Sequence, residues 1–316
     1  MERIWTEKFR PSIFKEVLGQ DKIVERIEAM TKNKNIPNLL FAGPAGVGKS
    51  TVALVIAHEL YGDKWKQSFL ELNASDSRGI DTIRGVIKDF ARTRAVSNVP
   101  FKIIFLDESD SLTKEAQQAL RRTMENFSDN VRFILSCNYS SKLIDPIQSR
   151  CSIFRFKPLE KEGMKKIIEK VKKDERLTID EKVIDAIYEI SDGDARRVVN
   201  ILQSSASLSK VITEDLVFNL VSAARPKEIK EVLDLAINGD FVKSREKLLD
   251  TMLKHGLSGF DVIKQIQKET LSLDIKDEKK LALIEKCGEI EFRMVEGSDE
   301  YLQIESLLAS YVLLGK

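Results

Sequence analysis

A glycine-rich segment of this 316-residue chain reads Gly43-Pro44-Ala45-Gly46-Val47-Gly48-Lys49-Ser50 and fits the pattern G-x-x-x-x-G-K-[ST]. An apolar run, residues 38–42, precedes it, and a helical pattern, residues 51–60, follows it. Glycines let backbone N–H groups curl around phosphate oxygens, and the N-terminus of the next helix carries a partial positive charge. A glycine-rich turn without a ligand is the alternative. The complete motif between a strand and a helix favours a phosphate-binding loop.

The end of this loop is expected to bind ATP and Mg²⁺. Lys49 would reach the β and γ phosphates, and Ser50 would hold the metal ion. Thr51 and the loop residues 43–48 complete the predicted phosphate-binding set.

Two acidic residues, Asp107 and Glu108, follow the apolar run 103–106. Open α/β sheets bind ligands at the carboxyl ends of their strands, so a buried strand would deliver both carboxylates to such a site. Asp107 would act on the metal, directly or through water, and Glu108 would polarise the attacking water as a base. In isolation, a strand that ends in solvent is the usual explanation of two such acids. Downstream of a phosphate loop the functional interpretation is the stronger one.

A neutral amide, Asn138, follows the next apolar run, residues 131–137. Its side chain could orient the water or sense the γ phosphate. A simple turn residue is an equally good interpretation from the sequence alone.

Short apolar runs recur through the first half of the chain, and helical patterns fill the gaps between them. The runs are residues 39–42, 69–72, 103–106, 133–136 and 153–156. Strands that alternate with helices predict a parallel sheet covered on both faces. After Pro158 the strand signal disappears, and apolar residues recur with helical spacing, as at Met164, Ile168 and Val171.

The helical half divides again at Arg225-Pro226, because a residue before proline is biased away from helix. Asn238-Gly239 and His255-Gly256 are expected to end helices. The fold class is therefore α/β plus all-α: an α/β domain over residues 1–160 and helical domains over 161–226 and 227–316. The apolar stretch 302–314 fits either packing across a subunit interface or an internal core.

Composition excludes several classes of protein. Charged residues make up 32% and no apolar run approaches the roughly 18–20 residues that span a bilayer, which predicts a soluble protein. Cys137, Cys151 and Cys287 stand apart, so a zinc site or disulfide framework is not expected, and a reducing, intracellular setting is favoured. Residues 1–157 carry 25 basic and 19 acidic residues, and the remainder carries 26 and 31. This asymmetry is compatible with an anionic partner for the first half, or with ordinary fluctuation.

Together these motifs resemble those of replication factor C, the AAA+ sliding-clamp loader. Besides the phosphate loop, the similar segments are Trp5–Pro11 (WTEKFRP), 18–20 (LGQ), 73–76 (NASD), 107–110 (DESD), 117–125 (QQALRRTME), 136–138 (SCN), 149–151 (SRC) and 193–197 (GDARR). The resemblance is dense over residues 1 to about 200. It departs at Ser109, where alanine is usual, and at Val47, where threonine is common.

The resemblance implies an AAA+ P-loop ATPase domain, a helical lid and a C-terminal helical collar, and it assigns further roles. Asn138 corresponds to sensor 1, and Arg196 to sensor 2, which reaches the γ phosphate from the lid. Arg150 corresponds to the arginine finger that completes the ATP site of the neighbouring subunit, where a guanidinium neutralises charge on the transferred phosphoryl group. Arg10, Pro11 and Val17 are further candidates, for the adenine pocket.

A basic stripe is the candidate DNA contact. Arg84, Lys88 and Arg92 are four residues apart and would share one face of a helix after a turn at residues 77–79. Contact with phosphates would be sequence-independent and salt-sensitive. A solvated helix face is the alternative, and the resemblance favours duplex DNA.

The resemblance implies a subunit that opens a sliding clamp, PCNA, and loads it on primer–template DNA at replication forks. It also implies other small subunits and a large subunit as partners, in an assembly expected to be pentameric. Another AAA+ DNA motor of the branch-migration type and an ATP-binding scaffold without turnover are the rival interpretations.

Overall fold

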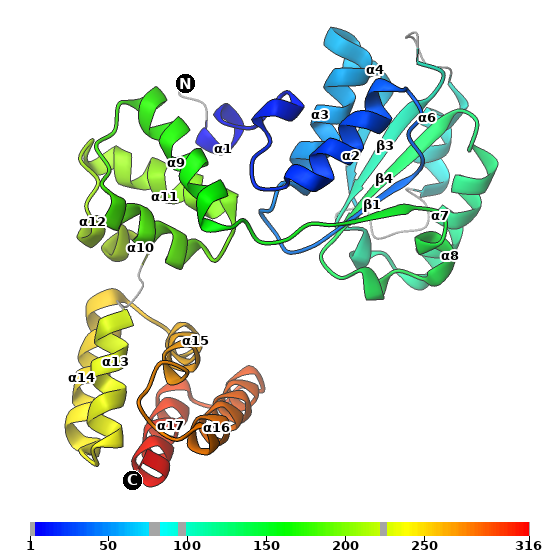
Figure 1. Ribbon diagram of the computed structural model, residues 1–316. Coiled ribbons are helices and arrows are strands. Elements are labelled where there is room, and N and C mark those ends of the chain that lie inside the picture. Colours follow the sequence, from blue (N-terminus) through cyan, green and yellow to red (C-terminus); the bar gives the residue numbers. More distant parts are fainter. Residues whose placement is uncertain (1–3, 76–82, 94–98, 222–225, 316) are drawn as a thin grey trace. The chain divides into compact units, whose positions relative to one another are not determined.

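The computed structural model describes residues 4–75, 83–93, 99–221 and 226–315 of the chain (Figure 1). The chain divides into two compact units, Met1–Val211 and Ile212–Lys316. Among the described residues, no helix combines the length and apolar character needed to cross a membrane.

A parallel sheet forms the centre of the first unit. Its strands are β1 (Leu39–Ala42), β2 (Phe69–Asn73), β3 (Lys102–Asp107), β4 (Val131–Cys137) and β5 (Ser152–Arg155). Their order is β2-β3-β4-β1-β5, and every neighbouring pair is parallel. Each apolar run of the sequence coincides with one of these strands, apart from Phe156, which follows the end of β5, and this confirms the predicted sheet. Because all the strands are parallel, the loop that follows β1 begins at the same sheet edge as the ends of β3 and β4.

Helices cover both faces of this sheet (Figure 1). They are α2 (Asp21–Lys32), α3 (Lys49–Tyr61), α4 (Trp65–Ser68), α6 (Lys88–Arg92), α7 (Lys114–Asn126) and α8 (Asp145–Gln148), with α1 (Trp5–Lys8) at the N-terminus. Short 3-10 helices span Phe14–Glu16, Gly62–Lys64, Ser109–Ser111 and Ser140–Lys142, and a π-helix spans Ile83–Ile87. Helix α3 buries residues around its circumference, as a central helix of an α/β layer must. Helix α7 begins at a Thr113 cap, which accepts from the Ala116 N–H.

After β5 the chain is helical, as the spacing of apolar residues predicts. Helices α9 (Lys161–Glu175), α10 (Glu181–Ser191) and α11 (Ala195–Leu208) pack together, and Asp180 and Asp194 cap α10 and α11. The N-terminus is tied to this group, because the Trp5 N–H donates to Gln203 Oε1 at 3.0 Å. These three helices therefore belong to the same compact unit as the sheet.

The second unit begins with α12 (Glu214–Val221) and continues with α13 (Pro226–Ile237), α14 (Phe241–His255), α15 (Gly259–Thr270), α16 (Asp277–Val295) and α17 (Glu300–Gly315). Gly239 and Gly256 have φ of 89° and 64° just after α13 and α14, which confirms both expected helix ends. The stretch 302–314 lies in α17, and Ile304, Leu307 and Tyr311 are buried in this unit's core. Arg225, the expected boundary, lies outside the described residues, and the three-domain division stays a prediction.

Candidate functional site

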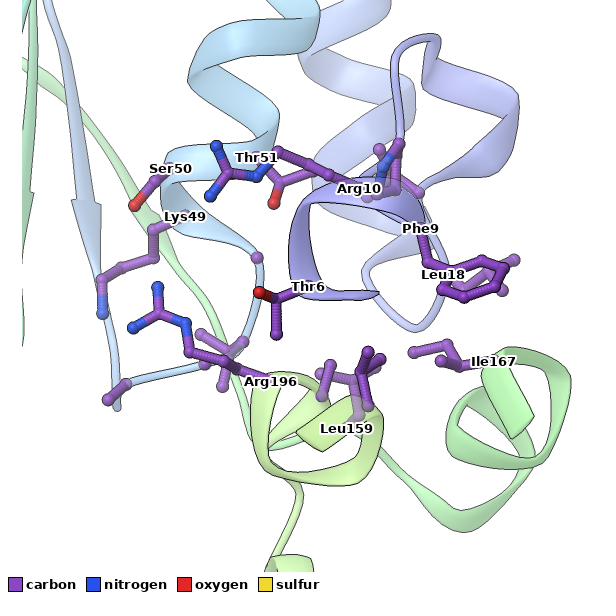
Figure 2. A pocket seen from close by; sticks show the side chains of 18 of the residues that line it. Thr6, Phe9, Arg10, Leu18, Lys49, Ser50, Thr51, Leu159, Ile167 and Arg196 are labelled. Atoms are coloured by element: carbon purple, nitrogen blue, oxygen red, sulfur yellow. The ribbon is translucent and has the colours of Figure 1, made fainter. Parts of the chain in front are cut away.

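A cavity of about 300 Å³ lies in the first unit, where the phosphate loop, the N-terminal segment and the helices after β5 meet (Figure 2). One end is polar and carries Lys49, Ser50 and Arg196. The other end is apolar and carries Phe9, Leu18, Leu159 and Ile167. This division matches a ligand that has a charged part and a flat apolar part, such as a nucleotide.

The phosphate loop adopts a conformation that requires glycine. Gly46 and Gly48 have φ of 70° and 99°, in the left-handed region that other residues rarely adopt. Helix α3 begins at Lys49, and no side chain caps it in the described structure. Its first N–H groups are therefore available to an anion.

Lys49 is buried at the centre of the polar end. Its Nζ donates to the carbonyls of Gly43 at 2.6 Å and Pro44 at 2.7 Å, and to Asn138 Oδ1 at 3.1 Å. Burial lowers the pKa of this ammonium, and the nearby carboxylate of Asp107 partly offsets that effect. The contact also brings Asn138, at the end of β4, next to the phosphate loop.

The predicted metal residues lie together. The Ser50 hydroxyl donates to Asp107 Oδ2 at 2.8 Å, so two oxygen donors converge between the start of α3 and the end of β3. Mg²⁺ prefers oxygen ligands and keeps several waters or phosphate oxygens, so this pair suits it. Glu108 follows in the left-handed region, with φ of 51°, and its N–H donates to Asp107 Oδ1 at 3.0 Å. An unusual backbone conformation at a cavity is typical of a functional residue.

Arg196 reaches the cavity from the first turn of α11. The neighbouring Ala195 N–H donates to the Gly46 carbonyl at 3.1 Å, which ties this helix to the phosphate loop. Arg10, Pro11 and Val17 also line the cavity, as do Gly46–Thr51 and Ala45 of the loop. The structure therefore brings most of the predicted nucleotide residues to one place.

Arg150 lies elsewhere and is not among the residues that line the cavity. It follows α8, and its guanidinium donates to the Pro146 carbonyl at 2.7 Å and to Glu125 at 2.5 Å. A residue that acts in trans must lie away from its own subunit's site, and the position of Arg150 meets that requirement.

The basic stripe is only partly described. Arg84 is in the π-helix Ile83–Ile87, and its side chain lies outside the described residues, as does the turn at residues 77–79. Lys88 and Arg92 are in α6, and Arg92 lies 3.8 Å from Asp89. The change from π to α geometry between Arg84 and Lys88 alters the simple four-residue spacing on which the stripe was predicted. DNA contact by these residues stays a prediction.

Several residues of the site belong to none of the predicted catalytic or nucleotide-binding sets. Gln20 is buried, and its amide donates to the Lys157 carbonyl at 2.7 Å and to the Val47 carbonyl at 3.4 Å. The apolar end is made by side chains from four separate segments: Phe9, Leu18, Leu159 and Ile167. The segment 18–20 was noted for its resemblance, but apolar residues scattered along a sequence carry no signal of a shared pocket.

Comparison with known proteins agrees with this geometry. The family "ATPase family associated with various cellular activities (AAA)" matches residues 39–159, and "Replication factor C C-terminal domain" matches residues 224–310. The chain is 50% identical to a replication factor C small subunit of Methanococcus maripaludis over 99% of this chain and 100% of that one. It is 50% identical to one of Staphylothermus marinus, over 100% of this chain and 96% of the other. For Archaeoglobus fulgidus the identity is 47%, over 99% and 98%.

Among solved structures, the chain resembles the RuvB Holliday junction branch migration motor of Thermotoga maritima. The TM-score is 0.57 at 20% identity, over 72% of this chain and 79% of that one. At this identity the similarity concerns the fold alone, and it confirms the fold class.

Proposed function

This chain belongs to the replication factor C small-subunit family, and on that basis we propose that it is the ATP-driven subunit of a clamp loader. Its AAA domain makes it an ATPase. The proposed work of that ATPase is to open a ring-shaped sliding clamp, PCNA, and to load it onto primer–template DNA. The observation that carries the proposal is one cavity. It gathers Lys49 from the start of α3, Asn138, Asp107 and Glu108 from the sheet edge, and Arg196 from α11.

The chemistry divides among these residues. Lys49 and the N–H groups at the start of α3 bind the β and γ phosphates, because a partial positive charge and an ammonium converge there. Glu108 accepts a proton from the attacking water, which Asn138 orients. Arg196 contributes a guanidinium from α11, so that phosphate binding draws the helices onto the loop. Arg10, Pro11 and Val17, with the apolar end, hold the adenosine.

Magnesium is part of the proposal. Ser50 Oγ and Asp107 Oδ2 are the protein groups that would hold it, the carboxylate directly or through water. When bound, Mg²⁺ neutralises charge on the β and γ phosphate oxygens.

Arg150 is proposed to act on the neighbouring subunit's ATP. Because it lies away from its own cavity, it supports turnover only in an assembly. The partners proposed are a large subunit and further small subunits in a pentamer, held by the C-terminal helices as a collar. Duplex DNA would contact Arg84, Lys88 and Arg92, and the protein would act inside the cell, at replication forks.

The two rival functions are less well supported. The resemblance to the branch migration motor is confined to the fold. In contrast, the relatives that are about 50% identical over nearly the whole chain are replication factor C small subunits. A scaffold without turnover would not need Glu108 beside the metal pair.

The test is the ATPase rate of the subunit reconstituted with its large subunit, with and without primed DNA and clamp. Wild type is expected to be stimulated by DNA and clamp together. Arg150→Ala is expected to lose on the order of 10³-fold in rate while still binding ATP, as loss of an arginine finger does. A suitable control is Lys165→Ala, since Lys165 pairs with Glu181 at 2.6 Å and is as exposed as Arg150, 37% for each side chain. A rate indifferent to DNA and clamp would leave an ATPase but exclude a clamp loader.

A further inference from the structure

The guanidinium of Arg150 is held by two acceptors from different elements. Its Nη1 donates to the Pro146 carbonyl in α8 at 2.7 Å, and its Nη2 donates to Glu125 Oε1 in α7 at 2.5 Å. The backbone is held as well, because the Arg150 N–H donates to the Ile147 carbonyl at 3.1 Å. These contacts restrict both the position and the rotation of the side chain. A guanidinium has further N–H donors, so the two contacts leave donors available for a phosphate.

The position of Glu125 is unfavourable for α7 itself. Glu125 is the next-to-last residue of α7, Lys114–Asn126, where the helix dipole is negative and disfavours a carboxylate. Arg121 lies one turn earlier in α7, and its Nε is 3.9 Å from the same Oε1. This second cation therefore offsets the unfavourable position of the carboxylate only at longer range. A residue that opposes the local preference of its helix, and is paired with a candidate functional group, is expected to serve function.

We propose that Glu125 is a positioning residue that holds Arg150 in the orientation required by the neighbouring subunit's ATP. This inference rests on the proposed role of Arg150 as a finger acting in trans. Preorganised groups stabilise a transition state without reorganisation during the reaction, and a side chain as long as arginine loses that advantage when it is free to rotate. The ion pair is partly exposed, with side-chain exposures of 37% and 39%, so its contribution to folding is small and its contribution to orientation is the larger one.

The test uses the complete reconstituted complex and compares Glu125→Ala with Arg150→Ala. Glu125→Ala is expected to lower kcat on the order of 10–100-fold, as misplacement of a catalytic group does, and to leave KM for ATP unchanged. Glu125→Gln keeps an oxygen acceptor in the same place and is expected to recover most of the rate. The double variant is expected to be no slower than Arg150→Ala, because Glu125 acts only through that arginine. Complex assembly and the melting temperature are measured for each variant.

The control is Glu181→Ala, which breaks the exposed pair with Lys165 and is expected to leave kcat unchanged. Equal rates for Glu125→Ala and wild type, or an effect that adds to that of Arg150→Ala, would overturn the positioning role and leave the finger intact. A normal rate for Arg150→Ala would overturn both the finger and the positioning role. The rate of this single variant therefore distinguishes failure of the finger from failure of the positioning role alone. A loss of rate in Glu125→Ala that follows loss of assembly would also overturn the proposal.

Discussion

At the scale of single residues, the buried ammonium of the site has hydrogen-bond acceptors. A buried ammonium without acceptors is costly, and the Gly43 and Pro44 carbonyls and Asn138 supply the acceptors for Lys49. Ser50 and Asp107 pair in the same way. Under the proposed function, bound ATP and Mg²⁺ would replace these contacts with contacts to phosphate and metal. Internal contacts of this kind hold the side chains in place without a ligand, which reduces the cost of ordering them on binding.

Gly46→Ala is expected to destabilise the chain without nucleotide by about 1–2 kcal/mol or more, because its φ of 70° is strained for alanine. A Cβ there would also lie 1.8 Å from Asp194 Oδ1 and push α11 from the loop. The measurement is urea denaturation of the isolated chain. Gly48→Ala separates the two effects, since Gly48 has φ of 99° but no neighbour within 4 Å of an added Cβ. Equal destabilisation by both substitutions would show that the Asp194 contact does not matter.

At the scale of elements, the segment between β5 and α9 connects the phosphate loop to the following helices. A Cβ at Gly43 would lie 2.3 Å from the Phe156 carbonyl oxygen, and one at Gly193 would lie 2.4 Å from Pro158 Cβ. The buried Gln20 amide donates to the Lys157 carbonyl in the same segment and to the Val47 carbonyl of the loop. Close backbone packing of this kind transmits small shifts because packed interiors deform little. A change in the loop on ATP binding is thus expected to move α9 and α11 together.

Helix α16 contains a glycine, Gly288, whose replacement by alanine tests the stability of this one helix. An added Cβ at Gly288 would have nothing within 4 Å. Gly288→Ala is expected to stabilise the chain by about 0.5–1 kcal/mol, because glycine loses more backbone entropy in a helix than alanine. Thermal unfolding of the uncomplexed protein measures it. In contrast, Gly259→Ala in α15 would place a Cβ 2.8 Å from Glu300 Cβ and is expected to destabilise. A destabilising Gly288→Ala would mean that the helix is not regular at that point.

At the scale of the whole molecule, each unit has its own core. The core of the second unit joins Ile229, Leu248, Ile263, Ile290 and Tyr311, one from each of α13 to α17. The core on one face of the sheet is a cluster of selected buried residues between Leu40 and Ile147, among them Ile104 and Phe133. Neither group draws on the other unit, so the two interiors are packed separately. A conformational change in the first unit therefore need not unfold the second.

We expect residues 212–316 to fold without the rest of the chain, because the apolar core of α13–α17 is complete within them. A fragment of this length can bury a sufficient core by itself. The measurement is thermal unfolding of the fragment followed by far-UV circular dichroism. We expect a helical spectrum at low temperature and a cooperative transition. Residues 1–211 serve as the companion fragment and are expected to bind ATP. A non-cooperative melt of the C-terminal fragment would show that the second unit needs the first.

The sequence alone determined the parallel sheet, the phosphate loop and the acidic pair Asp107-Glu108, because each depends on short-range pattern. A short apolar run, a glycine-rich turn and a carboxylate at a strand end are local properties, and the structure has them in the expected residues. The family's motifs added Arg196 and the candidates Arg10, Pro11 and Val17, which local chemistry did not distinguish from surface residues.

Only the tertiary structure decided which distant residues meet. The apolar end of the cavity draws Phe9, Leu18, Leu159 and Ile167 from separate segments. The Gln20 amide reaches two carbonyls, and Glu125 reaches Arg150 across 25 positions of sequence. The physical reason is that such contacts arise from the packing of whole elements, whose side chains are brought together by sheet order and helix placement and not by spacing along the chain.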